Sequence, residues 1–416
     1  MKTSRLFSFC GKIAAVAAAV IVMVAAMSVM AFAQTHTVSS LSDTAAKTAG
    51  YLMEQYADAA LGSEWAIIGM ARAGVPGCED FFAKYLDNLT ATLDETNGVL
   101  GEEVVDGETV YTYTDYARVV MALTALGLDP TNFSGYNLVT PLTSLEKIAA
   151  QGTNAVIFAL IALDCGDYDA EVRTEYLDYL KDNELEDGGF EFSPGWDLDV
   201  DTTAMAVTAL LPYADVDGVQ EVIDRAVAVM NTSRFDTGLF GGMWGESADT
   251  TGQIIMTLCD LGINPMTENA EWFGDGINPV TALMESSFDA ESGGFSMSYL
   301  DWTTGELVVS INAMTSNQVL RALAACIRFS EGKTGVYDMT DVAGSNVTTP
   351  TTTTATATTS TTIATASTTT AATTATTTTA ANADTGVDGG MGMMLMLCGT
   401  ALVCLVVCVR GVKSRT

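Results

Sequence analysis

The sequence predicts an all-α fold, an (α/α)6 toroid of six outer–inner helical hairpins that spans residues 34–341. Three observations predict it: apolar segments that recur with a Ser or Thr start, an amphipathic segment before each, and glycine turns between the two. Segments that are apolar nearly all round must be buried on every side, so they are expected to form an inner ring. Such a hairpin cannot bury its inner helix alone, and the repeats are therefore expected to close on themselves.

The inner helices are expected to begin at a small polar residue and to continue into small apolar ones. Their predicted starts are Ser63, Thr114, Thr153, Thr202, Thr250 and Thr315. The outer helices are predicted over residues 41–57, 77–94, 135–149, 169–183, 216–231 and 276–288. In the fifth of these, Val219, Val222, Ile223, Ala226, Val227 and Met230 fall on one stripe at helical spacing, which indicates a face turned toward the inner ring.

Glycine turns mark the passage from outer to inner helix. They read Gly188-Gly189-Phe190, Gly238-Leu239-Phe240 and Gly293-Gly294-Phe295. Glycine permits positive φ and close approach of the backbone, and the aromatic residue that follows is expected to fill the gap between hairpins.

These repeats resemble those of the squalene cyclase and protein prenyltransferase superfamily, whose toroids carry Gln-x-x-x-Gly-x-Trp. Phe190, Phe240 and Phe295 stand at the aromatic position, and Asn183 lies near the usual Gln. The resemblance covers most of residues 41–341 and is closest to toroid domains found on Gram-positive cell surfaces. It implies the fold, and activity must be argued from the site.

An acidic segment, Asp197-Leu198-Asp199-Val200-Asp201, precedes the fourth inner helix and holds the candidate catalytic residues Asp197, Asp199 and Asp201. Residues 199–204 resemble the Asp-x-Asp-Asp-Thr-Ala motif of squalene-hopene type cyclases, with Thr202 in place of the last Asp. The resemblance implies that Asp201 would be the proton donor.

A structural interpretation of Asp201 competes with the catalytic one. Asp201-Thr202-Thr203 recurs one repeat later as Asp249-Thr250-Thr251. We therefore expect Asp201 and Asp249 to cap their helices, each contributing about 1 kcal/mol. Asp197 and Asp199 lack a counterpart and are expected to have no structural role.

Other requirements of the enzymes argue against activity. A triterpene cyclase of this type is expected to need a second helical domain, and only one toroid is predicted here. A prenyltransferase needs zinc, but the only histidine, His36, precedes the first helix, so neither a metal site nor a cofactor is predicted.

If the inner helices run parallel, their N-termini gather at one mouth of the toroid with a set of aromatic and acidic residues. Aromatic faces beside carboxylates suit a sugar, a cationic ligand or a peptide. The predicted ligand-binding residues are Trp65, Tyr116, Trp196, Asp197, Asp199, Trp244, Glu246, Asp249 and Trp302.

The predicted function is a surface-anchored, non-catalytic module that binds a small molecule, a glycan or a protein at this mouth. The alternatives are a carboxylate-dependent glycan hydrolase or lyase, a degenerate terpenoid cyclase, and a cobalamin-type carrier. Two unsupported carboxylates facing one pocket would favour an enzyme. Acids that are all bonded to helix N-termini would favour binding.

The two ends of the chain predict export and anchoring. Residues 1–33 read as a signal peptide that ends in Ala31-Phe32-Ala33. A disordered Thr- and Ala-rich stalk over 342–390 leads to a membrane span over 391–409 and a basic cytoplasmic tail over 410–416. The toroid is therefore expected outside the cell.

A sorting-like motif lies just before the predicted span. Asn382-Ala383-Asp384-Thr385-Gly386 resembles the Leu-Pro-x-Thr-Gly signal of Gram-positive surface proteins, so sortase attachment to the wall and simple membrane anchoring both stay open. The net charge of −33 argues against nucleic acid as a partner. The outer domain is expected to be a monomer.

Overall fold

The computed structural model describes residues 36–105, 108–168, 171–243, 245–267, 269–273, 277–300 and 304–342. The predicted signal peptide, membrane span and sorting-like motif lie outside these residues, as does the predicted stalk apart from residue 342. Within the described ranges, no helix combines the length and the apolar character needed to cross a membrane.

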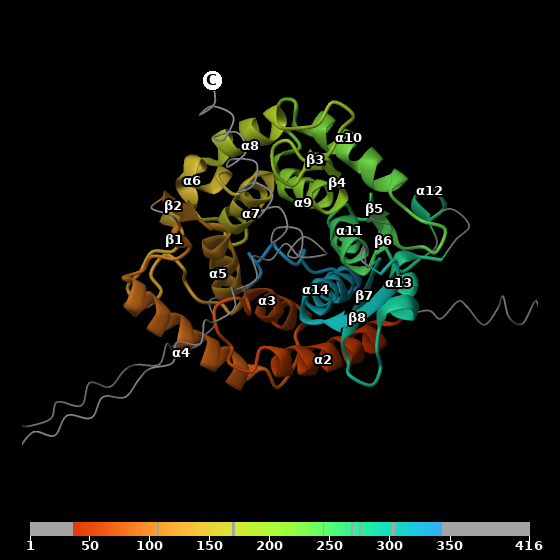
Figure 1. The fold of residues 1–416 in the computed structure, drawn as a ribbon, viewed down its shortest axis with the longest axis horizontal. Coiled ribbons are helices and arrows are strands. Elements are labelled where there is room, and N and C mark those ends of the chain that lie inside the picture. The colour runs from red at the N-terminus through yellow and green to blue at the C-terminus, as the bar shows by residue number, and fades with distance from the viewer. Residues whose placement is uncertain are drawn as a thin grey trace, which may run out of the picture.

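The inner helices form a closed ring (Figure 1). Each packs against the next along the chain, and the last returns to the first. All six begin within two residues of their predicted starts. They are α3 (Glu64–Ala73), α5 (Thr114–Ala125), α7 (Thr153–Asp164), α9 (Val200–Leu210), α11 (Ala248–Asp260) and α14 (Ala313–Ser330).

The outer ring is helical in five of its six predicted positions. Its helices are α2 (Val38–Gln55), α4 (Glu79–Thr96), α8 (Arg173–Asp182), α10 (Val219–Thr232) and α13 (Pro279–Ser287), with the short α12 (Ala270–Phe273) before the last. On α10 the predicted stripe is buried except for Val227, which is half-buried. The amphipathic pattern therefore located the outer layer.

The predicted outer helix over 135–149 is wrong. This stretch instead forms a 3-10 turn, η1 (Thr140–Thr143), and the short α6 (Leu145–Ala149). Pro141 lies in the first turn of η1, where it lacks an N–H and restricts the residue before it. Ser134 and Gly135 both have positive φ, a conformation outside the right-handed helical region, so a helix cannot begin at residue 135.

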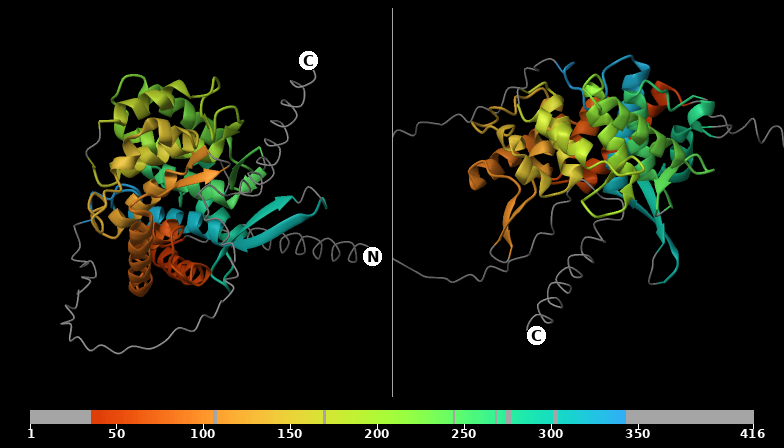
Figure 2. Two further views of the ribbon diagram at one scale, coloured as in Figure 1. Left: turned by 60° about the vertical axis from the view of Figure 1, so that its left-hand side comes forward. Right: turned by 90° about the horizontal axis from the view of Figure 1, so that it is seen from above.

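The fold is mostly helical, and in the described part of the chain it adds four two-stranded antiparallel sheets that the sequence did not predict, each before an inner helix. Their strands are β1 (Glu102–Val105) with β2 (Glu108–Tyr111), β3 (Phe190–Glu191) with β4 (Leu198–Asp199), β5 (Phe240–Gly242) with β6 (Gly245–Ser247), and β7 (Phe295–Leu300) with β8 (Leu307–Asn312). The β1–β2 and β7–β8 hairpins project from the same face of the ring (Figure 2). Periodicity had indicated only turns here.

Each glycine-aromatic turn starts one of the last three hairpins, and its aromatic residue pairs with the residue that caps the next inner helix. The pairs are Phe190 with Asp199, Phe240 with Ser247, and Phe295 with Asn312. A hydroxyl on the first turn of each helix, from Thr203, Thr251 or Ser316, accepts a hydrogen bond from the aromatic residue's N–H at 2.8–2.9 Å. Gly189 (φ +79°) leaves room for this contact, since a Cβ there would lie 2.9 Å from the Thr203 hydroxyl.

The opposite face of the ring is crossed by the last described segment, which follows α14 (Figure 2). Arg72 on α3 donates to the Val336 carbonyl at 3.0 Å and pairs with Asp341 at 2.8 Å, while Arg328 binds the other oxygen of Asp341. The Met339 N–H donates to the Cys165 carbonyl at the end of α7 at 2.8 Å. These bonds attach the segment to the C-terminal ends of the inner helices.

Candidate functional site

The candidate site is the mouth at which the inner helices begin. The N-cap of α9 is Asp199, whose Oδ1 accepts a hydrogen bond from the Thr202 N–H at 2.7 Å. The N-cap of α11 is Ser247, which accepts from the Asp249 N–H at 3.1 Å. The expectation that Asp201 and Asp249 cap these helices, and that Asp199 has no structural role, is therefore wrong.

The position of the cap follows from the hairpins. Asp199 and Ser247 are the last residues of β4 and β6 and keep the extended conformation that an N-cap needs. The strand register fixes them opposite Phe190 and Phe240. Asp201 and Asp249 come two residues later, inside the first helical turn.

Asp201 has a buried carboxyl oxygen, Oδ1, with no hydrogen-bond partner among the described residues. Burial raises its pKa well above the ordinary value, and the charge of Asp199 raises it further, while the nearby Thr250 hydroxyl opposes the rise. Ionisation is costly in this environment, so burial and the charge of Asp199 both favour the protonated form of Asp201.

Asp249 repeats this environment one helix further round the ring. It is 4% exposed, its Oδ1 also lacks a partner in the described part of the chain, and its Oδ2 accepts from the Thr315 hydroxyl at 3.1 Å. Burial raises its pKa to about 7, although Thr315 and Arg321 both favour the charged form. Asp201 and Asp249 thus interact with corresponding hydroxyls, Thr250 and Thr315, on the next inner helix.

The aromatic residue that reaches the interior is Trp65, at the start of α3. It is 5% exposed, its ring centroid lies 5.0 Å from that of Phe158 on α7, and its Nε1 has no partner among the described residues. The guanidinium of Arg321 on α14 lies 4.2 Å from its centroid. These three side chains, which come from three inner helices, pack together inside the ring.

The other predicted ligand-binding residues do not join this group. Tyr116 is buried, and its hydroxyl accepts from the Leu100 N–H at 2.8 Å and donates to the Gly98 carbonyl at 3.1 Å, which is a structural role. Trp196 packs on Phe192 in the turn between β3 and β4, beside the exposed Asp197. Exposed Glu246 on β6 accepts from the Thr237 hydroxyl. Trp244 and Trp302 lie outside the described residues.

Sequence reasoning missed a buried polar chain that leads away from the acids. The Gln318 amide donates to Gln253 Oε1 at 2.8 Å, and Arg321 donates to Gln318 and, at 2.6 Å, to the Tyr337 hydroxyl. Gln253 Nε2 has no partner in the described ranges. The available signal was Arg321 itself, a charged residue within the apolar run that follows Thr315.

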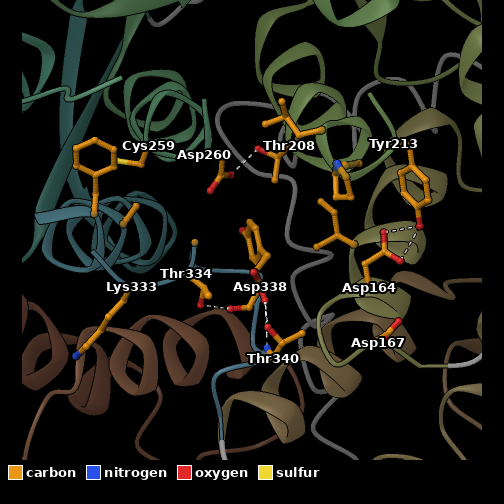
Figure 3. Close-up of a pocket in the computed structure, with 18 of the residues that line it drawn as sticks. Asp164, Asp167, Thr208, Tyr213, Cys259, Asp260, Lys333, Thr334, Asp338 and Thr340 are labelled. Carbon is orange, nitrogen blue, oxygen red and sulfur yellow. Dashed lines mark hydrogen bonds between the residues drawn. The ribbon is translucent and has the colours of Figure 1, made fainter. Parts of the chain in front are cut away.

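A cavity of about 790 Å³ lies at the opposite end of the ring, not at the mouth. It is bordered by the last turns of α7, α9, α11 and α14 and by the segment that crosses that face (Figure 3). The unpartnered carboxyl groups and the cavity therefore occupy different ends, and each needs its own interpretation. No three His, Cys, Asp or Glu side chains in the described residues are grouped so that they could hold a metal ion.

No family model and no curated protein matches this sequence. A variant of the type II terpene cyclase MstE from Scytonema, solved with geranylgeranyl dihydroxybenzoate, is 14% identical, with a TM-score of 0.51 over 70% of this chain and 99% of that one. Glycosyl hydrolase family 88 from Bacteroides vulgatus is 12% identical, with a TM-score of 0.48 over 71% of this chain and 99% of that one. ent-Copalyl diphosphate synthase from Streptomyces platensis is 19% identical, with a TM-score of 0.39 over 65% and 50%.

The similarity to the terpene cyclase supports the α/α toroid fold, with 70% of this chain covering 99% of that one. The likeness gives no support to the expected relation to Gram-positive surface toroids.

Proposed function

We propose that this toroid is a general-acid enzyme in which Asp201 donates a proton to an unsaturated, largely apolar substrate at the N-terminal mouth. The observation that carries the proposal is a carboxyl oxygen of Asp201, Oδ1, which is buried, has no hydrogen-bond partner among the described residues and lies in surroundings that raise the pKa of the group. Structural carboxyl groups are normally bonded, and an unbonded one inside a ring of helices is suited to act on a ligand.

The local sequence supports the same residue. Asp201 stands at the proton-donor position of the cyclase-like stretch 199–204. Asp199, which precedes it, accepts the Thr202 N–H as the helix cap, and its negative charge helps to keep the proton on Asp201. In this arrangement Asp199 caps α9 and raises the pKa of Asp201, and Asp201 supplies the proton.

The choice between a glycoside and an unsaturated hydrocarbon as substrate depends on whether a second, ionised carboxylate faces Asp201. A glycosidase needs an ionised carboxylate opposite its acid, as nucleophile or base. Asp249, with a pKa of about 7, is half protonated at neutral pH, and Asp199 is bonded to the α9 backbone. Protonation of a carbon–carbon double bond needs only the acid: the double bond takes the proton, the resulting carbocation closes a ring onto a second double bond, and loss of a proton to water or to the Asp201 carboxylate gives an isomer of the substrate. The type II terpene cyclase with a similar ring was solved with the substrate geranylgeranyl dihydroxybenzoate, which is an isoprenoid.

The test uses purified full-length protein and two linear isoprenoid probes, farnesol and geranylgeraniol, with products separated by gas chromatography and mass spectrometry. We expect cyclised isomers from the native protein and none from Asp201→Asn, which retains the shape of the side chain but cannot donate the proton. Asp197→Asn is the matched control and should retain activity, because Asp197 is exposed. Equal conversion by Asp201→Asn would refute the role of Asp201.

A binding module without turnover is the second candidate, and one residue favours it. Thr202 stands where the cyclase motif has its last Asp, so that carboxyl group is missing. Under this alternative, the isoprenoid probes would raise the melting temperature of the native protein and would be recovered unchanged. This result would replace the enzyme with a carrier at the same site.

We also propose that the toroid is displayed outside the cell, tethered by the apolar segment 391–409. Deletion of residues 391–416 should release the protein into the medium, because this segment is the long apolar stretch left after cleavage of the leader. Replacement of Thr385 by Ala separates the two tethers, since it would abolish sortase linkage and leave membrane retention intact. Retention of the deletion variant on cells would contradict the proposal.

A further inference from the structure

We propose that the cavity at the C-terminal ends of the inner helices is a second binding site, and that it takes a small organic cation with a primary amino group. The site is separate from the acids at the mouth and does not depend on their proposed function. Its volume of about 790 Å³ falls in the range of small-molecule pockets.

The cavity is assembled from distant parts of the chain (Figure 3). Asp260 and Thr208 come from the ends of α11 and α9. Tyr213 lies in the 3-10 turn η2 (Leu211–Tyr213) and faces Asp164 at the end of α7. The last side is formed by the segment around Asp338, which is attached to the ring by the bonds of Arg72 and Arg328 to Asp341.

The charges that border the cavity favour a cation. Four carboxylates line it, Asp164, Asp167, Asp260 and Asp338, against the two basic residues Arg173 and Lys333. Both basic groups are engaged: Arg173 pairs with Asp164 at 2.7 Å, and the half-exposed Lys333 pairs with Glu331, also at 2.7 Å. Figure 3 shows the Lys333 amino group pointing away from the centre. The lining therefore carries a net negative charge.

The C-terminal ends of the inner helices also favour a cation in the cavity. The inner helices α7, α9, α11 and α14 all contribute residues from their last turns. The C-terminal end of a helix carries partial negative charge on its unpaired carbonyl groups, which favours a positively charged group nearby. Four such ends around one cavity add to the effect of the carboxylates.

Asp260 is the residue best placed to receive the amino group. Its Oδ2 accepts from the Thr208 hydroxyl at 3.1 Å, and no salt bridge joins it to a basic side chain in the described part of the chain. Burial, with the nearby charge of Asp338, raises its pKa to about 7. An ammonium group at Asp260 would favour the ionised form, so binding near neutral pH should release a proton.

Aromatic rings supply the rest of the recognition. The Tyr213 hydroxyl donates to Asp164 at 2.8 Å, and the Tyr337 hydroxyl accepts from Arg321 at 2.6 Å. The rings of these two tyrosines, with that of Phe329, form apolar walls of the cavity. Such faces attract a cation and pack against its hydrocarbon part.

Isothermal titration of the full-length protein with phenethylamine tests the proposal, and the uncharged 2-phenylethanol is the matched ligand. We expect the amine to bind at least about tenfold more tightly than the alcohol, because a charge-assisted bond is lost with the amino group. Asp260→Asn should weaken amine binding by a similar factor, and Asp217→Asn, which changes an exposed acid that does not border the cavity, should not. The observed enthalpy should change with the buffer, as proton release requires.

Three results would overturn the proposal. They are failure of the native protein to bind the amine, equal affinity for amine and alcohol, and an Asp260→Asn protein of unchanged melting temperature that binds the amine as the native protein does. If Asp217→Asn weakened binding as much as Asp260→Asn, the amine would be a general counterion of an acidic surface, and the site would likewise be rejected.

Discussion

Inner helices on two sides of the mouth carry acids in their first turns. On one side these acids pair with an arginine, and on the other they do not. On the α3–α5 side, Arg118 binds Asp115 at 2.5 Å and lies 3.5 Å from Glu64, which also accepts from the Tyr85 hydroxyl. On the α9–α11 side, no salt bridge reaches Asp201 or Asp249 among the described residues, and each has an unbonded oxygen. Acids in the first turn of the inner helices are thus joined to a basic residue on one side of the mouth, and those on the other side are not.

The cause of this difference lies three residues along each helix. Asp115 is followed at that spacing by Arg118, which reaches it on the same helix face. Asp201 is followed by Ala204, and Asp249 by Gly252, neither of which can pair with a carboxylate. Without an arginine at this spacing, Asp201 and Asp249 have no opposite charge on their own helix, and burial raises the pKa of both.

The largest effect is expected on the paired side. Arg118→Met should destabilise the fold by about 3–5 kcal/mol, because it leaves Glu64 buried without its opposite charge. Urea unfolding measures this cost, and Arg225→Met is the control, since Arg225 pairs with Glu184 at the surface and should cost about 0–1 kcal/mol. A further Glu64→Gln substitution should recover part of the loss. Equal stability of Arg118→Met and the native protein would show that the two sides do not differ in this way.

The next effect is a pH dependence to which the unpaired side contributes, together with Asp260 at the other end of the ring, whose pKa burial also raises to about 7. The pKa of Asp249 is about 7 in the fold and about 3.9 in an unfolded chain, so the folded state binds more protons between these values. Stability should therefore fall as pH rises from about 4 to about 7, by up to about 4 kcal/mol, and the raised pKa of Asp201 adds to the same trend.

Asp249→Asn should reduce this slope, because Asn fills the same space and does not titrate, while the contribution of Asp260 remains. Urea unfolding at a series of pH values measures it, and Asp115→Asn is the comparison, since its carboxylate is paired with Arg118. If Asp249→Asn retained the full slope, Asp249 would not contribute to it.

A third and smaller effect separates the cap from the acid beside it. Asp199→Ala should cost about 0.5–2 kcal/mol, because the Thr202 N–H loses its acceptor, while Asp199→Asn should be mild. Asp201→Ala removes no hydrogen bond to the helix backbone and should cost less than Asp199→Ala. Thermal melts compare the variants, and the reverse order would restore Asp201 as the cap.

The sequence was sufficient for the ring but not for the details of its mouth. Recurrent hydroxyls such as Thr203 and Thr251 revealed where inner helices begin, since they occupy a position that every such hairpin needs. The predicted caps, Asp201 and Asp249, are the residues that recur between the two repeats. The true caps, Asp199 and Ser247, differ in residue type and so form no sequence repeat. Their alignment depends on strand pairing with Phe190 and Phe240, which local periodicity does not encode.

The cavity at the other end was not predictable in the same way. Asp164, Asp260 and Asp338 are separated by long stretches of sequence and share no motif. They meet only because the ring closes and the segment after α14 folds back across it. Repeats predict which elements stack, whereas a site built from the ends of several repeats needs the closed structure.

The smallest effect concerns Asp197, which is close in sequence to Asp199 and Asp201 but exposed in the turn between β3 and β4. Asp197→Ala should change the free energy of unfolding by less than about 0.5 kcal/mol, because no described hydrogen bond or ion pair involves its carboxylate. It should also leave the pH dependence of stability intact, since the side chain is exposed. Thermal melts and the pH series above measure both quantities. A loss comparable to that of Asp199→Ala would mean that the acids act as one cluster, and the division between a cap, a proton donor and a surface residue would not hold.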